Sequence, residues 1–259
     1  MTWRTDPINC RRLGQLAGEA PGGVIRYCRT CNVATEAEGL AAGNRPTVLI
    51  SSGSDAVATA AMAARLPRNV KRWFTTNCGI DPASALGARV EALPIGFTAC
   101  SGDILRLLIA QATRPRARKN LLLINHRRTH SAYKSAERVR LYNAFRPFRW
   151  ATMSGDLPQA DYYAELAAHD YTLSPAGAGP DCHRTWEALA LGTIPIVRRS
   201  VYTDVLDEMP ALQVEDWPEA GAERLEAELP RLRARFHSPA MQRLTLTYWR
   251  KRMEAALCA

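Results

Sequence analysis

The sequence has little that would place it in or across a membrane. No apolar run in its 259 residues approaches the roughly 18 residues that a helix needs to span a bilayer. The N-terminal stretch MTWRTDPINCRR also lacks the apolar core of a signal peptide. We therefore expect a cytoplasmic protein, with peripheral contact at the inner face of a membrane as the alternative.

Complete metal-binding patterns are also missing. Cys28 and Cys31 form a CxxC, but no second pair completes a zinc site, so reduced thiols are favoured over metal or redox use. His126 and His130 have the spacing of a zinc-binding helix, but Arg127 stands where that motif carries a glutamate. The sequence therefore predicts no bound metal.

Acidic residues are scarce relative to basic ones, which gives a formal net charge of +9. Such a charge suits nucleic acid, a membrane surface or a phosphorylated small ligand. The densest cluster is 114–119, followed by Arg127 and Arg128. No zinc-finger spacing or aromatic RNA-binding signature accompanies it. Specific nucleic-acid binding is not expected, although a basic nucleic-acid-binding protein stays an alternative.

From residue 47 onward, strand signals alternate with helix signals. The expected strands are 47–52, 73–75, 89–96, 121–125, 148–153, 171–175, 193–197 and 212–216. The expected helices are 55–66, 103–112, 135–145, 160–168, 201–206 and a long tail rich in arginine and leucine. Residues 1–45 read as irregular, with a turn at 21–23. This alternation predicts an α/β protein whose parallel sheets are covered on both faces.

The basic, proline-containing segment 113–120 divides this alternation into two runs. We therefore expect an N-terminal domain over 1–112 and a C-terminal domain over 113–240, each Rossmann-like, with a cleft between them. The last segment, 241–259, can form an amphipathic helix. Packing back on the N-terminal domain is favoured, and an anionic membrane surface is the alternative.

One stretch, AGAGPDCHRTWEALALGTIPIV at 176–197, orders a small-residue loop, a helix and a strand. A helix that starts near Asp181 would present backbone N–H groups to a phosphate. His183, Arg184 and Glu187 fall on one side of that helix. Arg184 could hold phosphate oxygens and Glu187 two ribose hydroxyls, but a plain surface pair of the two is the alternative. The dinucleotide pattern GxGxxG is absent.

The longer string SPAGAGPDCHRTWEALALGTIPIV resembles the C-terminal motif of exostosin-like glycosyltransferases, including small viral and bacterial relatives. Softer likenesses occur in LISSGSD, NVKRWFTTNCGID, ALPIGF and NLLLINHRRTH, and together they cover most of 47–217. Ala176 and Ala178 depart from the family, which often has a basic residue and an asparagine there. Donor contacts from those two side chains are therefore not expected.

The resemblance implies a GT-B fold, in which two Rossmann-like domains face a central cleft. It implies an inverting transfer of a sugar from a UDP-sugar to a glycan or glycolipid hydroxyl, as in polysaccharide or glycoconjugate synthesis. No metal or other cofactor is implied, and the sequence contains no Asp-x-Asp. A catalytically silent nucleotide-sugar or glycan binder is the alternative.

The resemblance also suggests roles for single residues. Asp55 follows a buried strand and is the expected catalytic base, with a helix cap as the alternative and Asp81 in reserve. The expected nucleotide-sugar-binding residues are Arg127, Arg128, Ser174, Gly177, Gly179, Asp181, His183, Arg184 and Glu187. Among them, Arg127 and Arg128 could instead form a solvated basic surface, and His183 could be a buried structural histidine.

Overall fold

The computed structural model describes residues 2–98, 102–115, 117–127 and 135–258. The chain divides into two compact units. Unit 1 comprises Met1–Gly96, Gly179–Asp181 and Gln242–Ala259, and unit 2 comprises Phe97–Ala178 and Cys182–Met241. The division expected after residue 112 lies instead after Gly96. The reason is that helix α3 (Gly102–Ala112) packs on α5 (Gln159–Ala167), which is a helix of unit 2.

Unit 1 contains a five-stranded sheet in the order β1-β2-β3-β4-β5. Its strands are β1 (Gly18–Ala20), β2 (Gly23–Arg29), β3 (Thr47–Ser52), β4 (Val70–Thr75) and β5 (Val90–Ala92). Strands β2 to β5 are parallel, whereas β1 pairs antiparallel with β2. Two expectations are therefore corrected, because 1–45 is not irregular and this sheet is not wholly parallel.

The turn expected at 21–23 joins β1 to β2. Gly22 has a φ of +82°, a left-handed value that suits glycine in a tight hairpin. The strands on either side were missed because β1 has only three residues, and because β2 does not alternate cleanly between buried and exposed positions.

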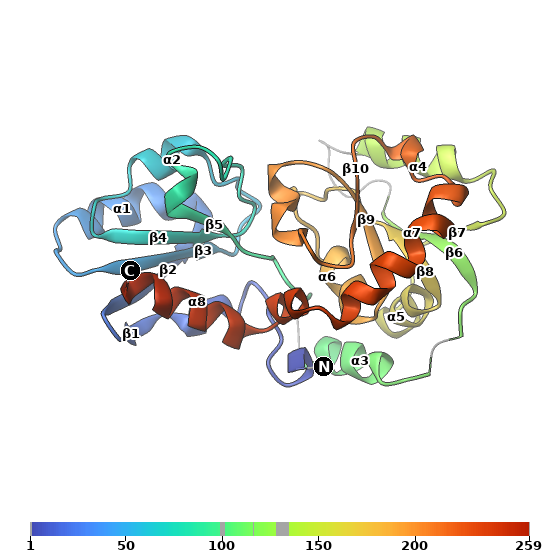
Figure 1. Ribbon diagram of the computed structural model, residues 1–259, viewed down its shortest axis with the longest axis horizontal. Helices are drawn as coiled ribbons and strands as arrows, with labels where there is room; N and C mark the ends of the chain where they lie inside the picture. The colour runs from blue at the N-terminus through green and yellow to red at the C-terminus, as the bar shows by residue number, and fades with distance from the viewer. Residues whose placement is uncertain (1, 99–101, 116, 128–134, 259) are drawn as a thin grey trace. The chain divides into compact units, whose positions relative to one another are not determined.

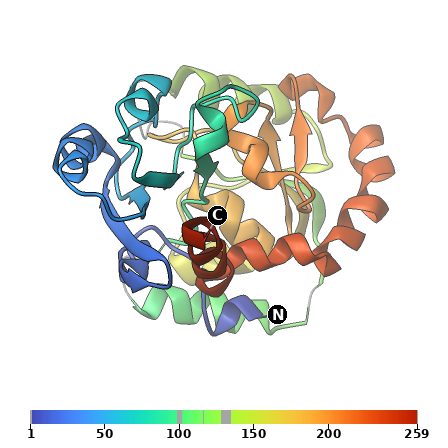
Figure 2. The same cartoon turned by 60° about the vertical axis from the view of Figure 1, so that its left-hand side comes forward.

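Helices cover both faces of this sheet. The helices α1 (Val33–Ala41) and α2 (Ala60–Ala64) pack against Leu49 and Trp73 on one face. The C-terminal helix α8 (Leu246–Cys258) packs on β2, β3 and β4 from the other face, as Figures 1 and 2 show.

The apolar side of α8 is used within unit 1. It buries Leu246, Trp249, Met253 and Leu257. Trp249 meets Phe74 of β4 edge-on, with ring centroids 6.5 Å apart, and its indole N–H donates to the Arg243 carbonyl at 2.8 Å. Helix α8 therefore contributes to the core of unit 1. No described helix is both long and apolar enough to cross a membrane.

The helix expected over 55–66 is shorter in the structure. Helix α2 begins at Ala60, and its N-cap is Thr59, whose hydroxyl accepts from the Met62 N–H at 3.4 Å. Asp55 lies before this helix in an exposed bend that follows β3. The alternative that Asp55 serves as a helix cap is therefore wrong for α2.

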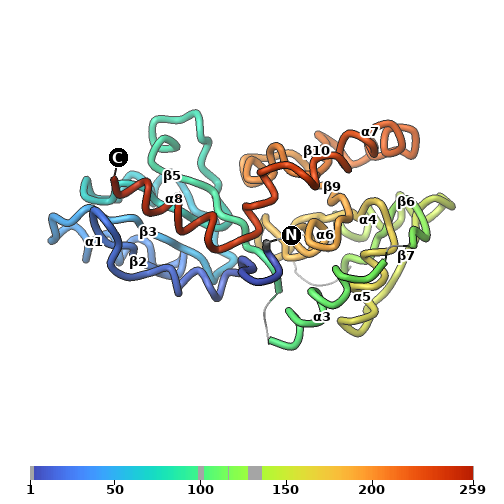
Figure 3. The backbone as a smooth tube through the Cα atoms, turned by 60° about the horizontal axis from the view of Figure 1, so that its bottom comes forward, coloured from blue at the N-terminus to red at the C-terminus, as the bar shows by residue number. Residues whose placement is uncertain are grey.

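Unit 2 has a wholly parallel sheet in the order β10-β9-β8-β6-β7. Its strands are β6 (Asn120–Ile124), β7 (Ala151–Met153), β8 (His169–Leu173), β9 (Ile194–Arg198) and β10 (Leu212–Val214). The helices α4 (Ser135–Phe145) and α7 (Ala222–Ala234) share one apolar core with these strands. Figure 3 shows α7 on one side of the sheet and α3 and α5 on the other. The predicted α/β class with parallel sheets is confirmed.

The strand order of unit 2 reverses at β6. After β6 the chain forms β7 on one side of it, then crosses to form β8 on the other side. At such a reversal, the loops that follow the two neighbouring strands run in opposite directions, and a crevice forms between them at the carboxyl ends of the strands. Ligands of open α/β sheets bind in that crevice. In this chain those ends carry Asn125 after β6 and Ser174 after β8. The strands described in unit 1 follow chain order and have no such reversal.

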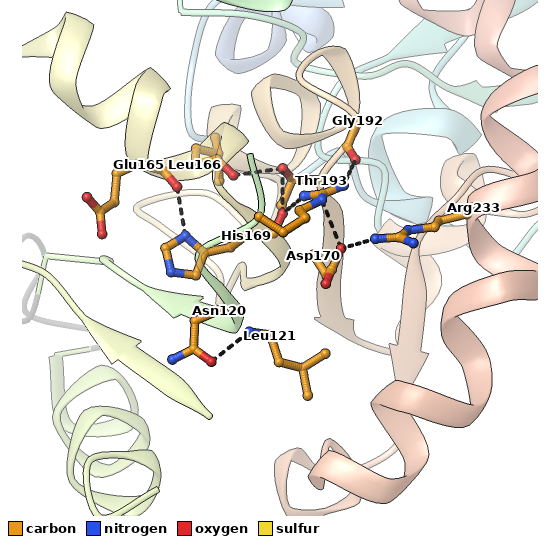
Figure 4. Close-up of polar contacts among 10 residues, drawn as sticks. Asn120, Leu121, Glu165, Leu166, His169, Asp170, Gly192, Thr193 and Arg233 are labelled. Carbon is orange, nitrogen blue, oxygen red and sulfur yellow. Dashed lines mark hydrogen bonds and ion pairs between the residues drawn. The ribbon is translucent and has the colours of Figure 1, made fainter. Parts of the chain in front are cut away.

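The opposite end of β8 is closed by an ionic network (Figure 4). Asp170 pairs with both Arg118 and Arg233. Thr193 donates to the carbonyls of Leu166 and His169 at 2.7 and 3.2 Å. These contacts tie the start of β8 to its neighbours.

Candidate functional site

Helix α6 (His183–Ala190) starts at the reversal in the sheet of unit 2. It begins two residues later than the expected start at Asp181, and its N-cap is Cys182. The Cys182 side chain makes no capping hydrogen bond, and the first turn of the helix holds no acidic residue. The partial positive charge of its N-terminus is therefore not offset by the helix's own first turn, which favours an anion there.

A buried hydrogen bond fixes this helix start to the strand before it. Ser174, directly after β8, and Thr185, in the first turn of α6, have hydroxyl oxygens 2.8 Å apart. The Ser174 hydroxyl is therefore engaged by the protein. Its predicted place beside a nucleotide stays a prediction.

Arg184 leans from α6 toward the end of β6. Its Nε donates to Oδ1 of Asn125 at 3.4 Å, and its Nη1 lies 3.9 Å from Sγ of Cys182. The side chain is half-buried, and no described carboxylate forms an ion pair with it. Arg184 therefore carries a cation to the carboxyl edge of the sheet, and its predicted contact with a diphosphate stays a prediction.

A second arginine, which the sequence analysis did not single out, reaches the same edge. Arg138 of α4 is only 4% exposed. Its Nε donates to the Ala176 carbonyl at 3.1 Å, and its Nη1 donates to the Arg127 carbonyl at 3.0 Å. Burial lowers the pKa of Arg138, and the nearby positive charge of Arg184 lowers it further. No sequence pattern marks Arg138 as a site residue, because an RVR stretch within a helix is typical of a solvated helix face.

His126 lies between these arginines and the sheet. It is 4% exposed, and its Nε2 is 2.9 Å from the Arg138 carbonyl oxygen. Its Nδ1 is buried, and no described residue forms a hydrogen bond with it. Burial lowers the pKa of His126 to about 4, with Arg184 and Arg138 acting in the same direction. A neutral ring that donates from Nε2 leaves Nδ1 as an unused acceptor.

The zinc-helix alternative involved His126 and His130, and His130 lies outside the described residues. The described part of the chain holds no group of three or more histidine, cysteine or acidic residues that could bind a metal ion. In the CxxC, Cys28 is buried and Cys31 exposed, and both are free. Burial raises the pKa of the Cys28 thiol to about 12, so it stays protonated.

The middle of the motif loop is fixed by unit 1. Asp181 accepts from the Ile95 N–H at 2.8 Å, and its own N–H donates to Oδ1 of Asn77 at 3.2 Å. A Cβ on Gly179 would lie 2.9 Å from Nδ2 of Asn77, so the close approach of that amide accounts for this glycine. Donor contacts of Asp181 and Gly179 stay predictions, as does that of Gly177, which is half-buried.

Glu187 lies on the buried side of α6, so the surface pair with Arg184 is not formed. Its carboxylate accepts from the hydroxyls of Tyr162 and Tyr163 at 3.0 and 3.1 Å, and from the Thr98 N–H at 3.3 Å. Burial, with the negative charge of Glu187, raises the pKa of Tyr162. Glu187 thus anchors α6 to α5, and its contact with a ribose stays a prediction.

The remaining residues predicted for the donor differ in exposure. Arg127 is exposed, and its Nε pairs with Oδ1 of Asp156 at 3.0 Å, as a solvated surface pair would. Arg128 lies outside the described residues. His183 is half-buried and interacts with other parts of the protein.

The two candidate bases in unit 1 have different surroundings. Asp55 is exposed, and no described residue forms a hydrogen bond or ion pair with its carboxylate. Asp81 is committed to a turn, because its Oδ1 accepts from the Ala83 N–H at 2.9 Å. Asp55 is therefore the freer carboxylate of the two.

Comparisons with known proteins bear on the same part of unit 2. Residues 125–220, less than half of the chain, match the family described as the RXYLT1 C-terminal domain. No curated protein matches the sequence. Among solved structures, sucrose-phosphate synthase from Thermosynechococcus elongatus is similar over 89% of this chain and 72% of that one, with 13% identity and a TM-score of 0.47. The segment similar to the RXYLT1 C-terminal domain thus begins at Asn125 and contains Arg138 and all of α6.

Proposed function

We propose that this protein is an inverting, metal-independent glycosyltransferase that moves a sugar from a UDP-sugar to a glycan or glycolipid hydroxyl. The GT-B fold is part of this proposal. One observation carries it: Arg184 and the uncapped start of α6 lie at the reversal of a parallel sheet, within a segment similar to the RXYLT1 C-terminal domain. This is an arrangement that suits a diphosphate.

In this reaction the anomeric carbon is attacked once. The acceptor hydroxyl gives its proton to a base, its oxygen bonds to the anomeric carbon, and the bond from that carbon to the UDP oxygen breaks. Arg184 and the N-terminus of α6 stabilise the charge that develops on the leaving diphosphate. We assign the base to Asp55, because its carboxylate is exposed and has no described partner.

A thermal-shift screen of UDP, GDP and CMP, with and without EDTA, tests the donor. UDP is expected to raise the melting temperature most, and EDTA is expected to leave that rise unchanged. Arg184→Met should remove most of it. A rise with CMP alone, or one that EDTA abolishes, would contradict the proposal.

Substitution of the two candidate bases tests the chemistry. Asp55→Asn is expected to lower kcat by about 10²- to 10⁴-fold, with UDP binding unchanged, because only proton removal is lost. Asp81→Asn is the matched control and should keep nearly full activity. Loss of activity in Asp81→Asn instead would move the base to that residue.

The alternatives predict other outcomes. A silent nucleotide-sugar binder would bind UDP yet show neither transfer nor donor hydrolysis in the unchanged protein. A nucleic-acid-binding protein would bind duplex or single strands with an affinity that falls steeply with salt, and UDP would not compete.

A further inference from the structure

We propose that Arg138 binds the diphosphate of the donor together with Arg184. Arg138 lies on α4, well outside the motif that suggested the site. The inference rests on the proposed function and adds a specific residue to it.

The burial of Arg138 is not matched by a negative partner. Removal of a charged group from water costs free energy unless the group is paired with an opposite charge. Arg118, at the opposite end of β8, is half-buried, and it pairs with Asp170. Among the described residues Arg138 has no such carboxylate. The adjacent Glu137 instead interacts with Arg198 and with the indole of Trp217, at 3.4 and 3.0 Å.

The guanidinium of Arg138 also has N–H donors that no described residue uses. A guanidinium carries five N–H donors. Two of them reach the carbonyls of Ala176 and Arg127, and the described residues offer the others no acceptor. The contact with Ala176 holds the group against the loop that leads into α6. The side chain is therefore held in place before a ligand binds, with donors left for phosphate oxygens.

The surroundings concentrate positive charge. Arg138 is hydrogen-bonded to the loop that leads into α6, and Arg184 lies in the first turn of that helix, so both cations lie near the helix start. The charge of Arg184 accordingly lowers the pKa of Arg138. His126, buried at the same place, leaves Nδ1 without a partner and stays neutral, so it adds no further charge. Glu137 partly offsets this charge, because it raises the pKa of Arg138, but its carboxylate is engaged by Arg198 and Trp217. A bound dianion relieves the remaining repulsion between the two arginines. A diphosphate is the ligand class that supplies this charge.

The test compares Arg138→Met with Arg140→Met. Both remove one positive charge from α4, but Arg140 is exposed. Affinity for inorganic pyrophosphate, UDP and uridine is measured by calorimetry. Arg138→Met is expected to lower the affinity for pyrophosphate and for UDP by about 10- to 100-fold. The affinity for uridine should stay unchanged, because only the charged hydrogen bonds to phosphate are lost. Arg140→Met should bind all three like the unchanged protein.

Each outcome decides between the two claims. If Arg138→Met binds UDP and pyrophosphate normally while Arg184→Met does not, the role of Arg138 is overturned and the proposed function stands. If the unchanged protein binds neither ligand, both fail. Circular dichroism checks the fold of each variant. Should Arg138→Met not fold, Arg138→Lys keeps the charge but not the planar fork. It is then expected to weaken pyrophosphate at least threefold with uridine unchanged, and normal binding by it overturns the inference.

Discussion

Arginines that cannot be distinguished in the sequence differ in their burial and in their partners in the folded protein. Arg127 is a solvated partner of Asp156, Arg118 is half-buried and paired with Asp170, and Arg138 is buried with carbonyls as its only partners among the described residues. Charge and spacing cannot distinguish these three cases, because burial depends on contacts between residues distant in sequence. The sequence could therefore predict Arg184, which lies within a motif, but not Arg138 or the orphaned nitrogen of His126.

The neutral state of His126 gives a pH dependence of stability. Its pKa is about 4 in the folded protein and near 6.5 when unfolded, so the unfolded chain takes up a proton first as the pH falls. The free energy of unfolding should fall by up to about 3 kcal/mol between pH 6.5 and pH 4 through this group. Urea titrations of the unchanged protein and of His126→Gln measure it.

The comparison of those two proteins isolates the histidine from other groups. Their difference in unfolding free energy should change with pH between 6.5 and 4 and stay constant above that window. Parallel curves across the whole range would show that His126 is protonated as readily in the folded protein as in the unfolded chain.

Asp170 is expected to matter more for stability than an exposed carboxylate does. Its side chain is 12% exposed and serves two arginines. Asp170→Asn should lower the free energy of unfolding by about 2 kcal/mol, because Arg118 and Arg233 then repel each other without a counter-charge. Asp103→Asn is the control. Its pair with Arg106 is exposed, and it should change stability by about 0.5 kcal/mol or less.

At the scale of elements, segments with strong local signals were predicted well. The strand at 47–52 and the helix at 135–145 have the bounds expected from the sequence. The failures were α2, which starts at Ala60 because Thr59 caps it, and the hairpin of β1 and β2. Both depend on local features that periodicity does not resolve, since a cap is a single residue and a three-residue strand is too short to show a clear alternation.

Helix α8 should be a major source of stability for unit 1. Trp249 is buried against Phe74, so Trp249→Ala should lower the free energy of unfolding by about 4 kcal/mol through the cavity that it leaves. Leu107→Ala, at a position that is 39% exposed on α3, is the control and should have a small effect. Equal effects of the two would mean that α8 is not packed on the sheet as described.

At the scale of the whole molecule, unit 1 is assembled from both ends of the chain. Sequence order alone favoured a division into consecutive domains and could not show that residues 179–181 cluster with unit 1. The strand order of unit 2, with its reversal at β6, also depends on pairing between strands far apart in sequence. The motif suggested candidate site residues, whereas the topology explains why several of them lie at one end of the sheet.

Removal of the last segment tests this arrangement. A chain that ends at Met241 lacks α8, so the face of β2, β3 and β4 that it covers becomes exposed. We expect that chain to bind a hydrophobic dye and to yield much less soluble protein than the full chain. A truncated chain that stays soluble and melts at the same temperature would show that α8 adds little to unit 1.

The buried Cys28 provides an internal reporter of these events. Its thiol is shielded and stays protonated, so an alkylating reagent can react with it only when the sheet around it opens. Cys31, three residues further along and exposed, meets the same reagent at all times. The ratio of the two labelling rates, followed by mass spectrometry, therefore measures how often unit 1 opens, and no cysteine has to be introduced.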